Sequence, residues 1–457
     1  MSRLVVVSNR VPMPRASRPE GGLATAVLAA LESRGGLWFG WDGTSSASSD
    51  ATPKRNRIGA VDFATMPLSK RDYDEYYKGY SNRVLWPLFH MRLDKMEYRR
   101  GFEEGYYRVN DLFARKLRPL IGRSDHLWIH DYHLIPLGRA LRRAGCQNPL
   151  GFFLHVPFPP FDILRALPGH QKLIRSLGAY DLVGFQTDVD LLGFRNSVAS
   201  SIHGSRVQKT AVLIDERPTR ADVFPISIDV EDVASRASKG RSSIQGRRLV
   251  DSLRGRRLII GVDRLDYSKG LTERFRAFER LLVNYPELRQ TVIFMQVAPP
   301  SRGDVPEYKS MRRELNAVAG EINGRFAEYD WVPIRYLNKG YARTAIVGFL
   351  SIAEVGFVTP LRDGMNLVAK EFVAAQDPDS PGVLLLSELA GAARELETAI
   401  LVNPHDVDGL AEGLHRAISM PLDERKRRWA SMMKVLREND IHQWRRRFVD
   451  GLQASAN

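Results

Sequence analysis

The chain has 457 residues, of which 44% are hydrophobic and 26% are charged; this balance is typical of a globular protein and excludes a disordered one. No apolar run reaches the roughly 18 residues that a membrane-spanning helix needs, so no membrane partner is expected. The net charge of +14 leaves nucleic acid and small polyanionic substrates to be considered as partners.

A chain of this length exceeds one ordinary hydrophobic core, so two or three domains are expected. The apolar run 4–7 is too short for a secretory signal and is interpreted as the first core strand. The single cysteine, Cys146, excludes an internal disulfide, fits a reducing cytoplasm and lies on a predicted surface turn. These features predict a cytoplasmic protein.

Basic residues gather most densely at 425–428 and 445–447, on helical patterns that are interpreted as solvated helix faces. Neither cluster is interleaved with aromatic residues, as an RNA-binding surface would be. No nucleic-acid partner is therefore expected, although a basic nucleic-acid-binding protein remains the alternative from a different functional class.

Short apolar runs rich in β-forming residues alternate with amphipathic stretches along the first half of the chain. The predicted strands are 4–8, 128–130, 151–155, 182–186 and 223–228. The predicted helices include 23–31, 109–120 and 137–144. This alternation is typical of a doubly wound parallel sheet. The Ser-rich tract 43–50 is expected to be a surface loop.

The same alternation restarts after a polar stretch, 230–256, in which a helix and a hinge are expected. The predicted strands are 257–262, 291–297, 332–337, 355–358, 383–386 and 400–402. The fold class is therefore α/β, with two Rossmann-like domains, 1–229 and 230–440, facing across a cleft. An amphipathic helix in 441–457 is expected to cross back to the first domain. Ligands of such sheets bind at the carboxyl ends of the strands.

The segment 360–371 carries the strongest local signal for a ligand site. It follows the apolar run 354–358 and precedes a helical pattern. Gly364 lets backbone N–H groups face outward, and the helix N-terminus adds partial positive charge, which suits an anion. Asp363 and Glu371 add acceptors for sugar hydroxyls. The segment favours a nucleotide-sugar pocket over a plain capped helix start.

Two further strand–loop–helix segments favour a diphosphate. Arg264 and Lys269 can place a forked donor and a point charge over a phosphate pair, although structural ion pairing with Asp263 or Asp266 is the alternative. Gly22 would let the backbone approach a diphosphate closely, although a plain glycine turn explains it equally well.

Two side chains stand directly at predicted strand ends, where chemistry occurs in such folds: Asp131 and His155. A lone strand-end histidine is more often structural than catalytic, and no spacing of ligands suggests a metal. Further residues suit a sugar face or a phosphate, although core packing explains any single aromatic: Trp41, Tyr77, Trp86 and Arg302.

Taken together, these motifs resemble the trehalose-6-phosphate synthases, which are retaining glycosyltransferases of family 20 and of the GT-B type. The matching runs, in the order of that family, are 7–10, 35–41, 82–90, 128–134, 151–159, 264–270, 301–305 and 359–371. They span nearly the whole chain, which makes the resemblance far more specific than any one motif.

The resemblance implies transfer of glucose from a nucleoside-diphosphate glucose, usually UDP-glucose, to glucose 6-phosphate, giving α,α-trehalose 6-phosphate. It implies no cofactor, no metal, a homo-oligomer (dimer or tetramer) and a separate trehalose-6-phosphate phosphatase downstream. The preference among UDP-, GDP- and ADP-glucose and the role of loop 11–20 stay open.

The resemblance also assigns roles to individual residues. The implied acceptor site consists of Arg10, Trp41, Tyr77, Trp86, Asp131 and Arg302, with the two arginines on the 6-phosphate. The implied donor site consists of Gly22, His155, Arg264, Lys269, Tyr341, Asp363, Gly364, Met365, Asn366, Leu367, Val368 and Glu371. The residues implied in catalysis are Asp131, His155, Arg264, Lys269 and Asp363.

Retention could come from a covalent carboxylate intermediate, as in retaining glycosidases, or from same-face attack with the leaving phosphate taking the acceptor proton. The resemblance implies same-face attack, and no carboxylate motif obviously offers a nucleophile. Two rivals remain besides nucleic-acid binding: a related transferase with another acceptor, such as glycerol 3-phosphate, and a catalytically inactive binding subunit.

Overall fold

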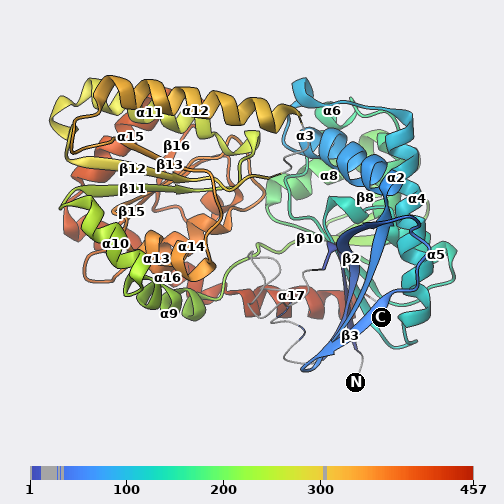
Figure 1. Ribbon diagram of the computed structural model, residues 1–457. Coiled ribbons are helices and arrows are strands. Elements are labelled where there is room, and N and C mark those ends of the chain that lie inside the picture. Colours follow the sequence, from blue (N-terminus) through green and yellow to red (C-terminus); the bar gives the residue numbers. More distant parts are fainter. Residues whose placement is uncertain (1–2, 12–27, 29–30, 32–34, 302–305, 456–457) are drawn as a thin grey trace. The chain divides into compact units, whose positions relative to one another are not determined.

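The fold is described from a computed structural model, in residues 3–11, 28, 31, 35–301 and 306–455. Contacts divide the chain into two compact units (Figure 1). Unit 1 comprises residues 1–226 and 442–457, and unit 2 comprises residues 227–441. Within the described ranges, no helix is both long enough and apolar enough to cross a membrane.

The described part of unit 1 contains a ten-stranded sheet of order β3-β4-β2-β1-β5-β6-β7-β10-β9-β8. Its strands are β1 (Leu4–Arg10), β2 (Gly36–Ser46), β3 (Lys54–Ile58), β4 (Val61–Ser69), β5 (His126–His130), β6 (Leu150–Phe153), β7 (Leu182–Phe185), β8 (Arg206–Val207), β9 (Ala211–Ile214) and β10 (Arg217–Val223). The central pairs are parallel, whereas β3–β4, β8–β9 and β9–β10 are antiparallel.

The described helices of unit 1 lie between these strands along the chain, except the last, which follows unit 2. They are α2 (Lys70–Asp72), the π-helix η1 (Tyr73–Leu85), α3 (Trp86–Phe89), η2 (Leu93–Lys95), α4 (Arg100–Leu117), η3 (Arg118–Leu120), η4 (Tyr132–Leu134), α5 (Leu137–Arg143), α6 (Phe161–Leu164), α7 (His170–Leu177), α8 (Asp188–Ser201) and α17 (Ile441–Ala454). A capping box between Thr187 and Asp190 fixes the start of α8.

Helix α17 completes the core of unit 1 by packing on β5, β6 and β7. The Phe448 ring stacks on Trp128 at a centroid distance of 4.6 Å. A Cβ atom at Gly151 or Gly184 would come within 2.8 Å of that ring, so both strands carry glycine where the helix approaches. The Trp444 indole N–H donates to the Phe224 carbonyl at 3.1 Å. The amphipathic pattern of this segment is therefore satisfied within unit 1.

Unit 2 is built on a parallel six-stranded sheet of order β13-β12-β11-β14-β15-β16 in its described residues. Its strands are β11 (Arg257–Val262), β12 (Val292–Val297), β13 (Ile334–Leu337), β14 (Val355–Val358), β15 (Val383–Ser387) and β16 (Ile400–Val402). The sequence predicts all six, each to within two residues at either end. They are continuous apolar runs, as expected for strands covered by helices on both faces.

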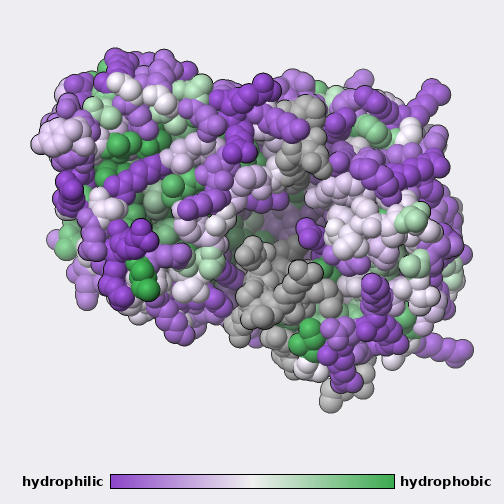
Figure 2. Space-filling model, viewed as in Figure 1, coloured by the Kyte–Doolittle hydropathy of each residue, from purple (hydrophilic) through white to green (hydrophobic). Residues whose placement is uncertain are grey.

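Helices cover both faces of this sheet, with α11, α12 and α15 on one side and α9, α10, α13 and α14 on the other (Figure 1). The helices of unit 2 are α9 (Val230–Arg241), α10 (Ile244–Leu253), η5 (Tyr267–Lys269), α11 (Leu271–Asn284), η6 (Pro286–Leu288), α12 (Pro306–Phe326), α13 (Arg343–Ile352), α14 (Leu367–Ala375), η7 (Gly391–Arg394), α15 (Val407–Ser419) and α16 (Leu422–Glu438). The predicted class, two Rossmann-like domains, is confirmed. Hydrophilic side chains are spread over the visible face of each unit (Figure 2).

Three local expectations were wrong. The predicted strand 223–228 ends at Val223, because Pro225 has no N–H with which to continue the ladder. The Ser-rich tract is not wholly a surface loop, since residues 43–46 continue β2 and Ser49 is buried against Asp72. Cys146 is fully buried rather than on a surface turn. The helix expected over 23–31 lies almost entirely outside the described residues.

Replacing Phe448 by alanine tests how far unit 1 depends on α17. Because Phe448 has no exposed surface, we expect Phe448→Ala to cost about 3–5 kcal/mol of unfolding free energy. Urea denaturation followed by tryptophan fluorescence measures the loss. Arg447→Ala, on the exposed face of the same helix, is the control and should change stability by less than about 0.5 kcal/mol. Equal effects of the two variants would contradict this account.

Candidate functional site

Asp131 stands at the end of β5 in a strained backbone conformation. Its φ of 76° and ψ of 164° place it in a region that is essentially restricted to glycine, at a cost of about 1–3 kcal/mol. Its N–H donates to the Phe153 carbonyl of β6 at 2.8 Å, and its Oδ1 accepts from the backbone N–H of His155 at 3.3 Å. Such strain clusters at functional sites, which supports the prediction for this carboxylate.

His155 follows β6 and contacts a second imidazole, His130 of β5. The His130 Nδ1 and His155 Nε2 atoms lie 3.0 Å apart, and the two rings stack at 5.3 Å. Burial lowers the pKa of His155 to about 3. Burial, reinforced by the neighbouring imidazole, also lowers the pKa of His130 well below its usual range. Both rings are therefore neutral at physiological pH. His130 had not been singled out from the sequence.

An aromatic cluster brings three of the predicted acceptor residues together. Trp41 lies 5.5 Å from both Tyr73 and Tyr77, and the Arg10 guanidinium lies 5.9 Å from the Trp41 ring. Tyr77 stacks on His133 at 6.0 Å. The His133 Nδ1 lies 3.8 Å from Asp131 Oδ2, which connects this cluster to the strained carboxylate.

Sequence reasoning missed Tyr73 and His133. Tyr73 precedes Tyr77 by four residues, and His133 follows Asp131 by two, so their spacing was the available signal. Trp86 is linked to the same cluster through Tyr132, whose ring lies 4.0 Å from that of His133. It is 5% exposed and packs on His90 at 4.1 Å and on Tyr132 at 5.8 Å.

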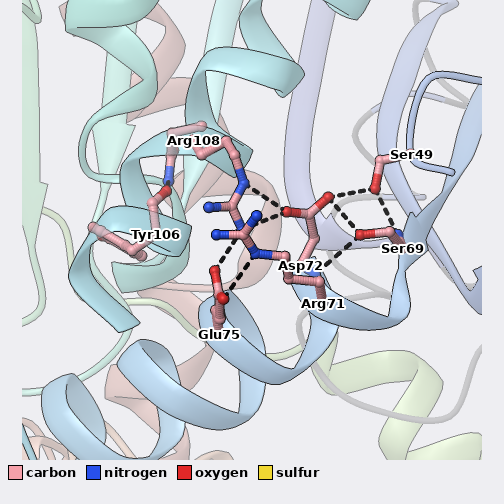
Figure 3. A network of polar contacts seen from close by, with 8 residues as sticks. Ser49, Ser69, Arg71, Asp72, Glu75, Tyr106 and Arg108 are labelled. Carbon is pink, nitrogen blue, oxygen red and sulfur yellow. Dashed lines mark hydrogen bonds and ion pairs between the residues drawn. The ribbon is translucent and has the colours of Figure 1, made fainter. Parts of the chain in front are cut away.

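The π-helix η1, which carries Tyr73 and Tyr77, is held at its start by a polar network around Asp72 (Figure 3). Arg108 of α4 donates to Asp72 Oδ1 from Nε at 2.9 Å and from Nη2 at 2.8 Å. The same Nη2 donates to Glu75 Oε2 at 2.6 Å. π-Helices are rare and are frequently found at functional sites. Here the guanidinium of Arg108 fixes the first turn of η1.

Hydroxyl groups complete this network. Ser49 and Ser69 donate to Asp72 Oδ2 at 2.5 and 2.8 Å. Burial raises the pKa of Asp72, but the bonds from Ser49, Arg108 and Ser69 outweigh it and hold the pKa below its usual value. Burial also raises the pKa of Glu75, but Arg108 and Arg71 lower it by more, so the pKa stays below its usual value.

In unit 2, the predicted loop 360–366 presents an ion pair at the start of α14. Lys269 Nζ donates to Asp363 Oδ2 at 2.5 Å, and Asn366 Nδ2 donates to the same oxygen at 3.1 Å. Asn366 has a φ of 79° and caps α14 by accepting from the Ala369 N–H at 3.2 Å. Gly364 is closely packed, since a Cβ at Gly391 would lie 1.9 Å from its carbonyl oxygen.

A buried arginine supports the loop that carries Arg264 and Lys269. Arg274 of α11 has no exposed surface and donates to Asp263 Oδ2 at 2.5 Å and to the Lys269 carbonyl at 3.1 Å. Asp266 instead accepts from the N–H and the hydroxyl of Ser268 and from the Tyr308 hydroxyl. The Lys269 ammonium is thus paired with Asp363, and Arg264 is exposed.

Other predicted donor residues also lie in unit 2. Glu371, 9% exposed, accepts from Arg343 Nη2 at 3.1 Å; burial raises the pKa of this carboxyl although Arg343 opposes the rise. Tyr341 packs edge-on against Phe349 at 5.5 Å. Met365 is buried, whereas Leu367 and Val368 are partly exposed in the first turn of α14.

Two predicted site residues, Gly22 and Arg302, lie outside the described residues. The remaining ones form two groups. The unit 1 group is Arg10, Trp41, Tyr77, Asp131 and His155, with Trp86 nearby in the core. The unit 2 group is Arg264, Lys269, Tyr341, Asp363, Gly364, Met365, Asn366, Leu367, Val368 and Glu371. Among the described residues, no set of three or more histidine, cysteine, aspartate and glutamate side chains is placed to hold a metal.

The strain at Asp131 predicts an order of stability between two variants. Asp131→Gly and Asp131→Ala both remove the carboxylate, but only glycine relieves the backbone strain. Strain relief of about 1–3 kcal/mol exceeds the unfolded-state entropy cost of glycine, about 0.4–1 kcal/mol. We therefore expect Asp131→Gly to be more stable by about 1 kcal/mol, measured by urea denaturation. A more stable alanine variant would rule out backbone strain at this residue.

The network around Asp72 predicts a pH-dependent loss of stability. Because Asp72 and Glu75 have lowered folded-state pKa values, their stabilisation is complete above their usual values of 3.8 and 4.5 and is lost as pH falls through the lower folded values. Arg108→Met should cost about 2 kcal/mol at pH 7. The difference from the unmodified chain should shrink as the pH is lowered below about 4.

Urea denaturation across this pH range measures both quantities. Arg71→Met is the matched control, because the exposed Arg71 pairs only with Glu75 among the described residues; it should cost less than about 1 kcal/mol. A difference between Arg108→Met and the unmodified chain that does not change with pH would argue against the carboxylates as its source.

The family model described as glycosyltransferase family 20 matches residues 2–454. The trehalose-6-phosphate synthase of Sinorhizobium fredii is 47% identical over 466 residues, covering 100% of this chain and 99% of that protein.

Two solved structures are similar over the whole chain. One is a UDP-forming α,α-trehalose-phosphate synthase from Burkholderia xenovorans in complex with glucose-6-phosphate, with a TM-score of 0.95, 48% identity and coverage of 99% of this chain and 100% of that one. The other, from E. coli, is bound with UDP-2-fluoro glucose, with a TM-score of 0.94, 45% identity and 99% coverage of both chains. The chain belongs to glycosyltransferase family 20.

Proposed function

We propose that this chain transfers glucose from UDP-glucose to glucose 6-phosphate, with retention, giving α,α-trehalose 6-phosphate and UDP. The observation that carries the proposal is the Lys269–Asp363–Asn366 group at the start of α14, which places a cation and a hydroxyl acceptor beside a helix N-terminus. Its support comes from family membership and from relatives whose structures hold glucose-6-phosphate or UDP-2-fluoro glucose.

The donor is proposed to bind the unit 2 group. Lys269, Arg264 and the N–H groups at the start of α14 attract the diphosphate, and Glu371 accepts from ribose hydroxyls. When UDP binds, Lys269 exchanges part of its bond with Asp363 for phosphate oxygens, which leaves Asp363 to accept from glucose hydroxyls. Negative charge grows on the diphosphate as it leaves, so these cations stabilise the transition state more than the ground state.

The acceptor is proposed to bind Arg10, Trp41, Tyr77 and Asp131 of the unit 1 group together with Arg302, whereas His155 of that group bonds the transferred glucose of the donor. Arg10 and Arg302 contact the 6-phosphate, the Trp41–Tyr77 cluster contacts the sugar face, and Asp131 accepts from acceptor hydroxyls. Because Asp131 is held in a strained backbone conformation, its carboxylate is oriented before the substrate arrives. Because both proposed substrates are anionic, basic residues at the site need no nucleic-acid partner to explain them.

The proposed chemistry is same-face substitution at the anomeric carbon. The bond from that carbon to the leaving phosphate oxygen breaks, and the bond to the acceptor oxygen forms on the same face. The acceptor proton moves to the leaving phosphate oxygen, so that no protein nucleophile is consumed. Isolation of a glucosyl-enzyme adduct would replace this route with a covalent one.

A nucleotide-release assay with purified protein tests the function. UDP-, GDP- and ADP-glucose are each supplied with and without glucose 6-phosphate, and the product is identified by NMR. We expect acceptor-dependent UDP release with an α,α-1,1 product. Arg264→Ala should lower kcat by about 100-fold, as expected when charge stabilisation of the transition state is lost. Arg280→Ala, an exposed arginine paired with Asp408 on the far helix α15, is the control with unchanged kcat.

Two results would count against the proposal. Release that occurs only with glycerol 3-phosphate would assign a different acceptor. Absence of release with every donor, by a protein whose melting transition is intact, would indicate a binding role instead.

A further inference from the structure

We propose that His130 is a positioning residue that fixes the tautomer of His155, so that His155 presents its Nδ1–H as a donor to one hydroxyl of the transferred hexose. This inference rests on the proposed function for the identity of the ligand. The tautomer itself follows from buried contacts in unit 1 alone.

One proton is shared between the two facing ring nitrogens. His130 Nδ1 and His155 Nε2 are 3.0 Å apart, which is hydrogen-bond distance. Since both imidazoles are neutral, each ring carries a single N–H, and only one of the two facing atoms can hold a proton in this bond. Either His130 donates to His155, or His155 donates to His130.

The far nitrogen of His130 decides between these arrangements. His130 is completely buried, and its Nε2 has no hydrogen-bond partner in the described part of the chain. If His155 donated, His130 would carry its proton on Nε2, as a buried N–H without an acceptor. If His130 donates, Nε2 keeps only a lone pair. Orphaned buried N–H groups are rarer than under-satisfied acceptors, so His130 is the donor.

The neighbouring Trp128 side chain supports the same tautomer. The Trp128 ring lies 4.6 Å from that of His130, and its Nε1–H also has no partner among the described residues. An indole N–H can only donate. An N–H on His130 Nε2 would add a second unpaired donor beside that of Trp128, whereas a lone pair would not.

The consequence for His155 is a fixed direction of hydrogen bonding. Its Nε2 accepts from His130, so its proton is on Nδ1, and no other described group bonds to its ring. His155, at the end of β6 and next to Asp131, is mostly buried but keeps part of its surface exposed. It therefore offers a donor to a sugar hydroxyl oxygen, whereas the neighbouring Asp131 carboxylate offers an acceptor. His155 would therefore favour a hexose hydroxyl that accepts a hydrogen bond from its Nδ1–H and donates its own proton to another group.

The matched variants are His130→Asn and His130→Leu, which have nearly the same shape. The asparagine amide N–H₂ can replace the Nδ1–H donor, and leucine cannot. His126→Phe, four residues earlier on the same strand, is the control. Thermal melts establish that each variant folds.

Nitrogen-15 NMR of the histidine-labelled full-length protein reads the tautomer without any substrate. The chain has ten histidines, and His155→Gln identifies the His155 signals by their loss. We expect His155 to be protonated at Nδ1 in the unmodified protein, in His126→Phe and in His130→Asn, and to become a tautomer mixture in His130→Leu. Protonation at Nε2 in the unmodified protein would overturn the proposal, even if no His130 variant folds.

Kinetics with UDP-glucose and its 2-, 3-, 4- and 6-deoxy forms test the functional half. We expect His130→Leu to lower kcat/KM for UDP-glucose about tenfold, the value of one hydrogen bond. The one deoxy donor that lacks the hydroxyl bonded by His155 should show no such loss. His130→Asn should stay near the unmodified value. An equal loss for all donors would indicate a purely structural role and overturn the proposal.

A double-mutant cycle completes the test. Because His130 acts through His155, adding His130→Leu to His155→Gln should cause little further loss; additive losses would contradict the link. If the unmodified protein transfers no glucose, the proposed function fails, while the NMR experiment still decides the tautomer.

Discussion

The candidate binding edge of unit 2 depends on one buried guanidinium. Arg274 donates to Asp263, Gln296 and Thr359, which lie at or near the carboxyl ends of β11, β12 and β14. It also donates to the Lys269 carbonyl. One side chain thus ties three parallel strands to the backbone of the loop that carries the candidate phosphate-binding cations. Its removal would leave Asp263, whose pKa burial already raises, as an uncompensated buried carboxylate.

Unit 1 achieves comparable order by different means, because its candidate residues come from strand ends and from a π-helix. Backbone strain orients Asp131, an imidazole contact orients His155, and Arg108 fixes the first turn of η1. Each device uses a partner that is distant along the chain. The candidate groups are therefore held before any ligand binds, which limits the ordering cost of binding.

Much of the fold could be predicted from local sequence, and much of the supporting structure could not. The six strands of unit 2 are continuous apolar runs, whereas β3 is exposed along its whole length and gives no apolar pattern. Motif order indicated Lys269 and Asp363, but not that they pair across 94 positions. The π-helix depends on Arg108, 36 positions beyond Asp72, so no local pattern could reveal it. Roles at Gly22 and Arg302 stay predictions.

The division of the chain has a consequence for synthesis on the ribosome. Unit 2 is continuous, but unit 1 requires α17, whose residues follow the whole of unit 2. At about 5–20 residues per second, the ribosome needs about 10–40 s to make the intervening segment. During that time the surface around Trp128 that Phe448 later covers stays open, as a site for a chaperone or for misassociation. Unit 1 is thus begun first and completed last.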